Sequence, residues 1–401
     1  MLNRLYLAAL FAFFACSCHP TPTRLQLGSY QLLFQVNDVQ IPIRLSITDS
    51  TWTIHNAGED IFLKPIFLEN DSFTVEMPLF HTLLCGTIIN DTTVQGLWVD
   101  PTRTTLNTIP YSLHKTSKII DFNTTESSTT TWDCTFSPGL EKDESKAIGV
   151  FQHDGSRVHG TFMTETGDFR YLEGKQNGGN MQLSCFDGTH LFHFDATMRG
   201  DSIINGTFLS GLSWKESWNA VFDPTASLQH PDSLTTMTDS KSLRFQALNL
   251  NNELVTFDST DFLGHVTIIQ IFGTWCPNCT DESKFLKELY AAYANDNLQI
   301  IPVAYEREAP VTEQLYRIQR QFKDLGLTYP PYLGGASPKT NAQQTFHQLN
   351  HVMSYPTAIF IDKQARVRKI HTGFYGPGTG QYHQHHKEKL LLFIEQLLHE
   401  S

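Results

Sequence analysis

Two patterns of apolar and polar residues follow each other along the chain, and they predict two kinds of structure. From Leu25 to about Leu113, apolar residues alternate with polar ones, as in the segment Ile41 to Ile47. Pairs such as Asn37-Asp38 lie between these runs, where hairpin turns are expected. A period of two places alternate side chains on opposite faces of a strand. The first pattern therefore predicts antiparallel strands with one face exposed to water.

A second region of the same kind follows a Ser/Thr-rich stretch at residues 123–131. We expect one β-rich region over residues 24–225, with 24–118 and 130–225 as its candidate units. Whether these form one sandwich or two β units is open from the pattern alone. The segments NDTTVQGLW (90–98) and GDSIINGTF (200–208) resemble each other loosely and predict two similar hairpins.

The pattern changes after residues 226–242, which are poor in apolar residues and are expected to form a linker. Beyond them, apolar runs alternate with segments of helical periodicity. The predicted strands are 266–272, 300–305, 358–361 and 366–371, and the predicted helices are 279–294, 312–324 and 387–398. Such alternation predicts a sheet with helices on its faces, over residues 243–401.

Length and charge limit the possible functions. A chain of 401 residues is long enough for two or three domains at about 150 residues each. Its 41 acidic residues outnumber its 29 basic ones, for a net charge of −12, and no block of Lys and Arg interrupts the polar stretches. A nucleic-acid partner is therefore not expected, because it would need a basic surface.

The first residues are typical of an export signal. Arg4 precedes an apolar run from Leu5 to Ala15, which is too short for a bilayer span of about 20 residues. An apolar run followed by a small residue and cysteine resembles the lipobox of bacterial lipoproteins. We therefore predict a lipoprotein signal peptide at residues 1–18, with a lipid anchor on Cys16 or Cys18 and a periplasmic or cell-surface location. An ordinary cleaved signal is the alternative, and both lead to a compartment where thiols tend to oxidise.

The sequence Cys276-Pro277-Asn278-Cys279 follows the predicted strand 266–272 and opens a helix. Backbone N–H groups and the positive end of the helix dipole stabilise a thiolate at that position. Cys276 is therefore the expected nucleophile toward a disulfide, and Cys279 is expected to resolve the mixed disulfide. Pro277 suits the first turn, where its missing N–H costs nothing.

These residues carry a family resemblance. The segment Phe272 to Cys279, Glu282, and Tyr355-Pro356-Thr357 before a strand resemble the TlpA/ResA group of exported, thioredoxin-fold thiol-disulfide oxidoreductases. The resemblance covers about 243–401 and implies an α+β multidomain chain, with an antiparallel β region before a thioredoxin-like α/β domain. It implies a cis peptide bond before Pro356, and it suggests the lipid-anchored two-part arrangement of Bacteroidetes-like lipoproteins. The substrate groove implied by it consists of Trp275, Pro277, Tyr355, Pro356 and Thr357.

Periodicity places Glu282 near the cysteine pair. On the helix, Glu282 shares a face with Cys279 and Leu286, and on the strand Gln270 lies among apolar residues. Thioredoxins proper carry an acid at the position of Gln270, and an amide cannot accept the proton of Cys279. Glu282, with a pKa raised by burial, is therefore the expected proton acceptor. The alternative is a helix first-turn acid favoured only by the dipole.

The predicted function is reduction of protein disulfides, with protein disulfides or dithiols and an upstream electron donor as partners and with no cofactor. The direction rests on the resemblance, so an oxidase or isomerase is an alternative. A second alternative is a partner- or ligand-binding lipoprotein whose β region dominates function.

Other chemistry-bearing residues are expected to matter less. Zinc binding or a static disulfide at the Cys pair is disfavoured, because zinc needs two more ligands and the pair lies at a strand-to-helix turn. Cys85, Cys134 and Cys185 are expected to be free, with one structural disulfide as the alternative. His383, His385 and His386 are expected at a solvated helix start, so that no metal site is predicted.

Overall fold

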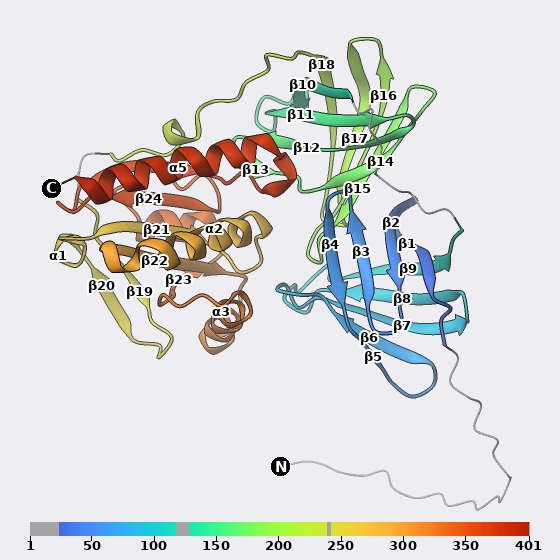
Figure 1. The fold of residues 1–401 in the computed structure, drawn as a ribbon, viewed down its shortest axis with the longest axis horizontal. Helices are drawn as coiled ribbons and strands as arrows, with labels where there is room; N and C mark the ends of the chain where they lie inside the picture. Colours follow the sequence, from blue (N-terminus) through green and yellow to red (C-terminus); the bar gives the residue numbers. More distant parts are fainter. Residues whose placement is uncertain (1–23, 118–127, 239–241, 401) are drawn as a thin grey trace, which may run out of the picture.

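The computed structural model describes residues 24–117, 128–238 and 242–400, which form three sheets (Figure 1). The predicted signal peptide, with Cys16 and Cys18, lies outside the described residues. None of the helices in the described part is long and apolar enough to cross a membrane.

The first β unit, residues 24–117, is an antiparallel meander whose last strand returns to its first, because β9 pairs with β1. Asn37 has a φ of 51° and, with Asp38, forms the two-residue turn between β1 and β2 at the predicted place. The strand order is β4-β3-β2-β1-β9-β8-β7-β6-β5. The strands are β1 (Gly28–Val36), β2 (Val39–Ile47), β3 (Trp52–Asn56), β4 (Glu59–Leu63), β5 (Pro65–Phe67), β6 (Ser72–Glu76), β7 (Leu83–Asn90), β8 (Thr93–Val99) and β9 (Thr108–Lys115).

The second β unit, residues 128–222, is a closed antiparallel barrel. Nine strands form its sheet, and β13 pairs only with β12, so the remaining eight close the ring through the β11–β12 and β10–β18 pairs. The strands are β10 (Ser128–Phe136), β11 (Ser145–Asp154), β12 (Arg157–Thr164), β13 (Gly167–Asp168), β14 (Leu172–Asn177), β15 (Asn180–Phe186), β16 (Leu191–Arg199), β17 (Ser202–Ser210) and β18 (Trp214–Phe222).

Aromatic side chains fill the interior of this barrel. The ring of Phe194 stacks on the rings of Phe162 and Phe208, each at 4.4 Å between centroids. The ring of Trp218 packs against that of Phe162 at 5.0 Å. Alternating residues of each strand point inward, so the aromatic-rich sequence provides a solid core.

The two segments that resemble each other, residues 90–98 and 200–208, both begin at the turn of a hairpin. Asp91 lies in the turn between β7 and β8, and Asp201 lies in the turn between β16 and β17. Asn205-Gly206 lies inside β17, at an irregularity of its pairing with β18. Glycine is required there, because a Cβ atom at position 206 would lie 2.4 Å from the carbonyl oxygen of Trp218.

The C-terminal domain, residues 242–400, has a mixed sheet in the order β20-β19-β23-β22-β21-β24-β25, with parallel pairing in β21–β22 and β22–β23. All seven residues of β21 are buried, as expected for a central strand covered on both faces. The elements are β19 (Phe245–Leu248), β20 (Leu254–Phe257), α1 (Ser259–Phe262), β21 (Val266–Phe272), α2 (Pro277–Tyr293), η2 (Ala294–Asp296), β22 (Leu298–Glu306), α3 (Val311–Leu325), β23 (Tyr332–Ala336), α4 (Lys339–Thr345), β24 (Thr357–Ile361), β25 (Val367–Thr372), η3 (Pro377–Thr379) and α5 (Gln381–His399).

The described part of the segment predicted as a linker packs on the C-terminal domain. It contains η1 (Pro231–Ser233), and Thr235 is buried, with its hydroxyl 2.9 Å from that of Thr372. Asp232 pairs with His371 at 2.6 Å. The described residues of the predicted linker are therefore held on the C-terminal domain by specific polar partners on β25, which compensate for their few apolar side chains.

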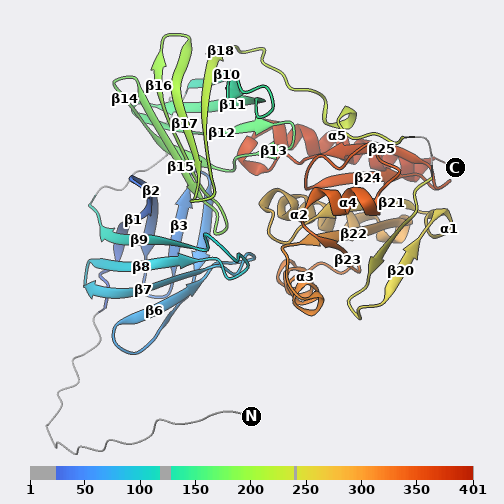
Figure 2. The ribbon, with the colours of Figure 1, turned by 180° about the vertical axis from the view of Figure 1, so that it is seen from behind.

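The C-terminal domain lies beside both β units (Figures 1 and 2). Arg307 binds Asp100 of the first β unit at 2.6 Å, and Arg170 of the second β unit pairs with Asp281 on α2. The contacts of both β units therefore reach the part of the C-terminal domain that carries the cysteine motif.

Candidate active site

Cys276 caps α2 and is bonded to Cys279 through their sulfur atoms. β21 ends at Phe272, and four residues later Cys276 has an extended backbone with a φ of −104°, which lets its side chain turn back over the helix. Its Sγ accepts a hydrogen bond from the backbone N–H of Cys279 at 3.2 Å. In the reduced state the same donor and the helix dipole would stabilise a thiolate on Cys276.

Three of the residues predicted for the groove surround Cys276. Its Sγ lies 3.6 Å from the carbonyl oxygen of Tyr355, and the Tyr355–Pro356 peptide bond is cis. Trp275 is half-buried and meets the Tyr355 ring edge-on, at 5.9 Å between centroids.

The other two predicted groove residues lie behind this surface. Pro277 is buried in the first turn of α2, and Thr357 is fully buried, with its hydroxyl donating to the carbonyl oxygen of Ser354 at 2.9 Å. The expectation that these two line an open groove is not met, because both begin elements that pack inward. Pro277 and Thr357 therefore support the site without lining its surface.

Glu282 is buried next to Gln270. The Gln270 amide donates to the Glu282 carboxylate at 2.9 Å and to the carbonyl oxygen of Cys279 at 3.2 Å, so one side chain joins the acid to the turn that carries Cys279. Burial raises the pKa of Glu282 to about 8, against the smaller lowering effect of the Gln270 hydrogen bond. Its pKa thus lies near the ordinary value of a thiol, about 8.5, which suits proton exchange between the two.

Glu306 was not anticipated, although it fixes the loop before Cys276. Its carboxylate accepts hydrogen bonds from the backbone N–H of Thr274 at 2.8 Å and from the Thr274 hydroxyl at 2.7 Å. Gln321 of α3 donates to the carbonyl oxygen of Thr274 at 2.9 Å. An acid at the end of the apolar run 300–305 could have indicated such a role, since the ends of neighbouring parallel strands meet at one edge of a sheet.

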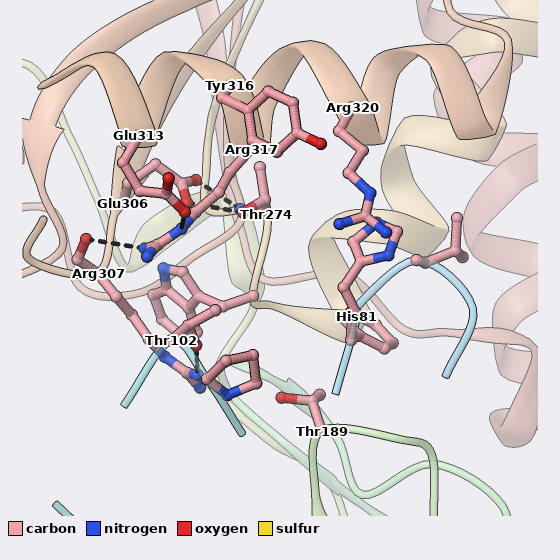
Figure 3. Close-up of a pocket in the computed structure, with 14 residues that line it drawn as sticks. His81, Thr102, Thr189, Thr274, Glu306, Arg307, Glu313, Tyr316, Arg317 and Arg320 are labelled. Carbon is pink, nitrogen blue, oxygen red and sulfur yellow. Dashed lines mark hydrogen bonds and ion pairs between the residues drawn. The ribbon is translucent and has the colours of Figure 1, made fainter. Parts of the chain in front are cut away.

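Trp275 borders a cavity of about 130 Å³ between the C-terminal domain and both β units (Figure 3). Its indole N–H donates to the carbonyl oxygen of Tyr305 at 3.0 Å, and the Arg307 guanidinium lies over its ring at 5.7 Å. The opposite wall carries His81 of the first β unit and Thr189 of the second. The surroundings of Trp275 are therefore built by all three parts of the chain.

The three other cysteines within the described residues do not form disulfides. Cys85, Cys134 and Cys185 are free, so the alternative of a structural disulfide among them is not met. Burial raises the pKa of the Cys134 thiol to about 12, which keeps it unreactive.

The histidines lie inside α5, which begins at Gln381, six residues earlier than predicted. His383 contacts the carbonyl oxygen of Tyr375 at 2.7 Å, and His386 packs on His371 at 4.5 Å. These tertiary contacts extend the helix through a polar sequence. In the ranges that the structure describes, no group of three or more His, Cys, Asp or Glu residues is placed to hold a metal ion.

Comparisons with known proteins show which proteins the C-terminal part of the chain resembles. Residues 220–381 match the family model described as Redoxin. The chain is 30% identical over 114 residues to the thiol-disulfide oxidoreductase ResA of Geobacillus thermodenitrificans, a match that covers 28% of this chain and 58% of ResA. It is 28% identical over 114 residues to the thioredoxin-like protein YneN of Bacillus subtilis, covering 28% of this chain and 59% of that protein. The chain therefore spans somewhat more than half the length of these curated relatives.

Among solved structures, a thiol:disulfide interchange protein of the thioredoxin family from Chlorobium tepidum aligns with 41% of this chain and 99% of its own length. The TM-score is 0.30 and the sequence identity 19%. The family match and the curated relatives support a thioredoxin-fold, ResA-like domain in the C-terminal part of the chain.

Proposed function

We propose that the chain is an exported thiol-disulfide oxidoreductase that reduces protein disulfides through Cys276 and Cys279. The observation that carries this proposal is the position of Cys276, which caps α2 and accepts the backbone N–H of Cys279 at 3.2 Å. A structural disulfide gains nothing from a helix N-terminus at one of its sulfurs, whereas a nucleophilic thiolate is stabilised by it. The relatives named thiol-disulfide oxidoreductase support the same reaction class.

The reaction begins from the dithiol form. The Cys276 thiolate attacks one sulfur of a substrate disulfide, forms a mixed disulfide and releases the other substrate sulfur as a thiolate. Cys279 then loses its proton and attacks the Cys276 sulfur, which releases the second substrate thiolate. Two electrons pass to the substrate, and the Cys276–Cys279 disulfide remains until an external dithiol donor reduces it.

Glu282 moves the proton of Cys279 in this scheme. Cys279 is fully buried, so bulk water does not reach its thiol. Glu282 lies one helical turn further along α2, on the same face, and the Gln270 amide holds its carboxylate at 2.9 Å. We propose that Glu282 accepts the thiol proton of Cys279 as Cys279 attacks. The alternative is that Glu282 serves only as a buried helix acid.

Membrane attachment belongs to the same proposal. The segment at residues 1–18 supports a lipid anchor on Cys16 or Cys18, and an oxidising compartment would need a reductant supplied from elsewhere. A reduction potential of about −270 mV for the Cys276–Cys279 pair would fit a reductant, whereas a potential of about −120 mV would favour the oxidase alternative.

The β region is proposed to position the redox domain or to select its substrates. The alternative, in which residues 24–225 act chiefly as a binding protein, is less well supported for the second β unit, because stacked rings such as Phe162 and Phe194 fill its interior. The contacts of both units around Trp275 and α2 favour a role at the redox site.

Trapping tests the proposal. The variant Cys279→Ala should accumulate mixed disulfides on Cys276 in an export compartment, because the resolving thiol is missing. The matched control Cys276→Ala should accumulate none. Absence of mixed disulfides from Cys279→Ala, with the folded protein present, would refute the assignment.

A further inference from the structure

A hairpin of the second β unit reaches the cysteine motif itself. β12 and β13 are joined at residues 165–166, and Gly167 follows directly. A Cβ atom at Gly167 would lie 2.2 Å from the side-chain nitrogen of Asn278, the residue between Pro277 and Cys279. The adjoining Asp168 accepts the backbone N–H of Gly376 at 2.6 Å. We call residues 165–171 the gate loop.

Arg170 fastens the gate loop to the helix that carries the cysteines. Its guanidinium pairs with Asp281, two residues after Cys279, and with Glu59 of the first β unit at 2.8 Å. Asp187 lies 3.9 Å from its Nε. Arg170 is only 6% exposed, so this cluster is shielded from solvent and from salt. One cation therefore joins the two β units and the start of α2.

The gate loop lies beside the surface where a substrate backbone would have to dock. Cys276 Sγ faces the carbonyl oxygen of Tyr355, and the carbonyl oxygen of the next residue, Pro356, accepts the backbone N–H of Gly373 at 2.8 Å. A Cβ atom at Gly373 would lie 2.7 Å from the backbone of Thr166. The strip from Cys276 through Pro356 to Gly373 thus ends against the gate loop.

The first β unit borders the other side of the motif. Arg307, which lies over Trp275, binds Asp100 at 2.6 Å, and Arg320 of α3 pairs with Glu76. Between these two borders Cys276 is 6% exposed. A polypeptide needs room on both sides of the sulfur that it presents, and a small molecule does not.

We propose that the gate loop occupies part of the docking surface for polypeptide substrates, and that a protein disulfide reaches Cys276 only when Arg170 releases Asp281. This inference rests on the proposed function for its substrate class. The opening itself is a property of the fold, and it can be measured without any turnover.

The first experiment compares labelling of Cys276 by a small and a large thiol reagent in the reduced full chain. Loss of the free Cys276 peptide is followed by mass spectrometry with iodoacetamide and with a maleimide on a long polyethylene-glycol chain. If the large reagent reacts only with the open form, its labelling rate is proportional to the fraction of molecules in which the gate is open. We expect Arg170→Met and Gly167→Ala to speed the large reagent by about tenfold or more, with less than about a twofold change for the small one.

The two variants open the gate in independent ways. Arg170→Met removes the cation, and Gly167→Ala adds a Cβ against Asn278 without changing any charge. Arg199→Met removes an exposed arginine of the same β unit and should leave both rates unchanged. If Arg170→Met fails to fold, Gly167→Ala decides. Equal acceleration of both reagents, or no acceleration in a folded variant, would overturn the gate.

The second experiment measures turnover with a protein disulfide and with a small aromatic disulfide. The open variants should reduce the protein disulfide about tenfold faster while the small disulfide is reduced at an unchanged rate. If neither substrate is reduced by any form of the chain, the proposed function fails, and the labelling result still decides on the gate. If the variants leave the ratio of the two rates unchanged, the gate does not control substrate access.

Discussion

The acid next to Cys279 provides the sharpest test of the site, through the change Glu282→Gln. Burial raises the pKa of Glu282 from its ordinary value of 4.5 to about 8. A raised pKa of an acid means that the folded state binds the proton more tightly than the unfolded state does. Folding stability should therefore be full below pH 4.5, fall as the pH rises from about 4.5 to about 8, and level off above that.

The magnitude follows from the same values. At about 1.4 kcal/mol per pH unit, the interval from 4.5 to about 8 corresponds to about 5 kcal/mol of stability lost. Relaxation around the ionised carboxylate reduces the loss, so we expect on the order of 2–5 kcal/mol. Glutamine keeps the shape of the protonated acid and cannot ionise, so Glu282→Gln should not show this loss.

The assay is denaturant unfolding of the oxidised chain at pH 5 and pH 9, followed by the helical circular dichroism signal. In the described residues all α-helices belong to the C-terminal domain, so this signal reports on the domain that holds Glu282. The control Glu288→Gln changes an exposed acid of α2, which pairs with Lys387, and should keep the wild-type pH dependence. If Glu282→Gln loses as much stability between pH 5 and pH 9 as the wild type does, the assignment of a buried, proton-holding Glu282 is wrong.

Three further changes test other parts of the structure. Phe162→Ala leaves a cavity among the stacked rings of the barrel and should cost about 3–5 kcal/mol, measured by denaturant unfolding with aromatic circular dichroism. Glu306→Gln weakens the two hydrogen bonds from Thr274 and should destabilise the domain by about 1–3 kcal/mol, with faster hydrogen exchange at the Thr274 amide as the specific sign. Asp232→Asn breaks the pair with His371 and should make the segment around residue 232 cleave faster in limited proteolysis.

Elements that depend on local periodicity were predictable from the sequence. The strand over residues 266–272 is present with those bounds. A continuous run of apolar residues is visible in the sequence without knowledge of the neighbouring strands. β23 was missed, since its sequence YLGGA has two glycines and few side chains to set a period. The start of α5 was placed too late, because its first turns carry polar residues. His383 and His386 are held there by tertiary contacts with Tyr375, His371 and Phe374, which no apolar pattern in the helix reveals.

Residue patterns alone predicted members of the active site only where they are close in sequence, and Tyr355 and Pro356 were predicted from the family resemblance. Glu282 follows Cys279 by one turn and was identified from helical spacing. Glu306 lies 32 residues from Thr274, and Arg170 lies 111 residues from Asp281, so no local pattern joins these pairs. Each is a polar side chain that burial alone would disfavour, and only the tertiary partner explains its position.

The burial of Cys279 links the chemistry of the site to its enclosure. In the oxidised chain Cys279 holds no proton, and Glu282, with a pKa of about 8, is mostly protonated at neutral pH. When a donor reduces the disulfide, Glu282 can give this proton to the buried Cys279 thiolate, and when Cys279 later resolves a mixed disulfide, Glu282 can take it back. Glu282→Gln should therefore slow both half-reactions in rapid-mixing experiments, whereas opening the gate should speed only the half-reaction with a protein substrate. A variant that slows both half-reactions equally acts on proton transfer. A variant whose effect depends on the size of the reaction partner acts on the access of that partner to Cys276.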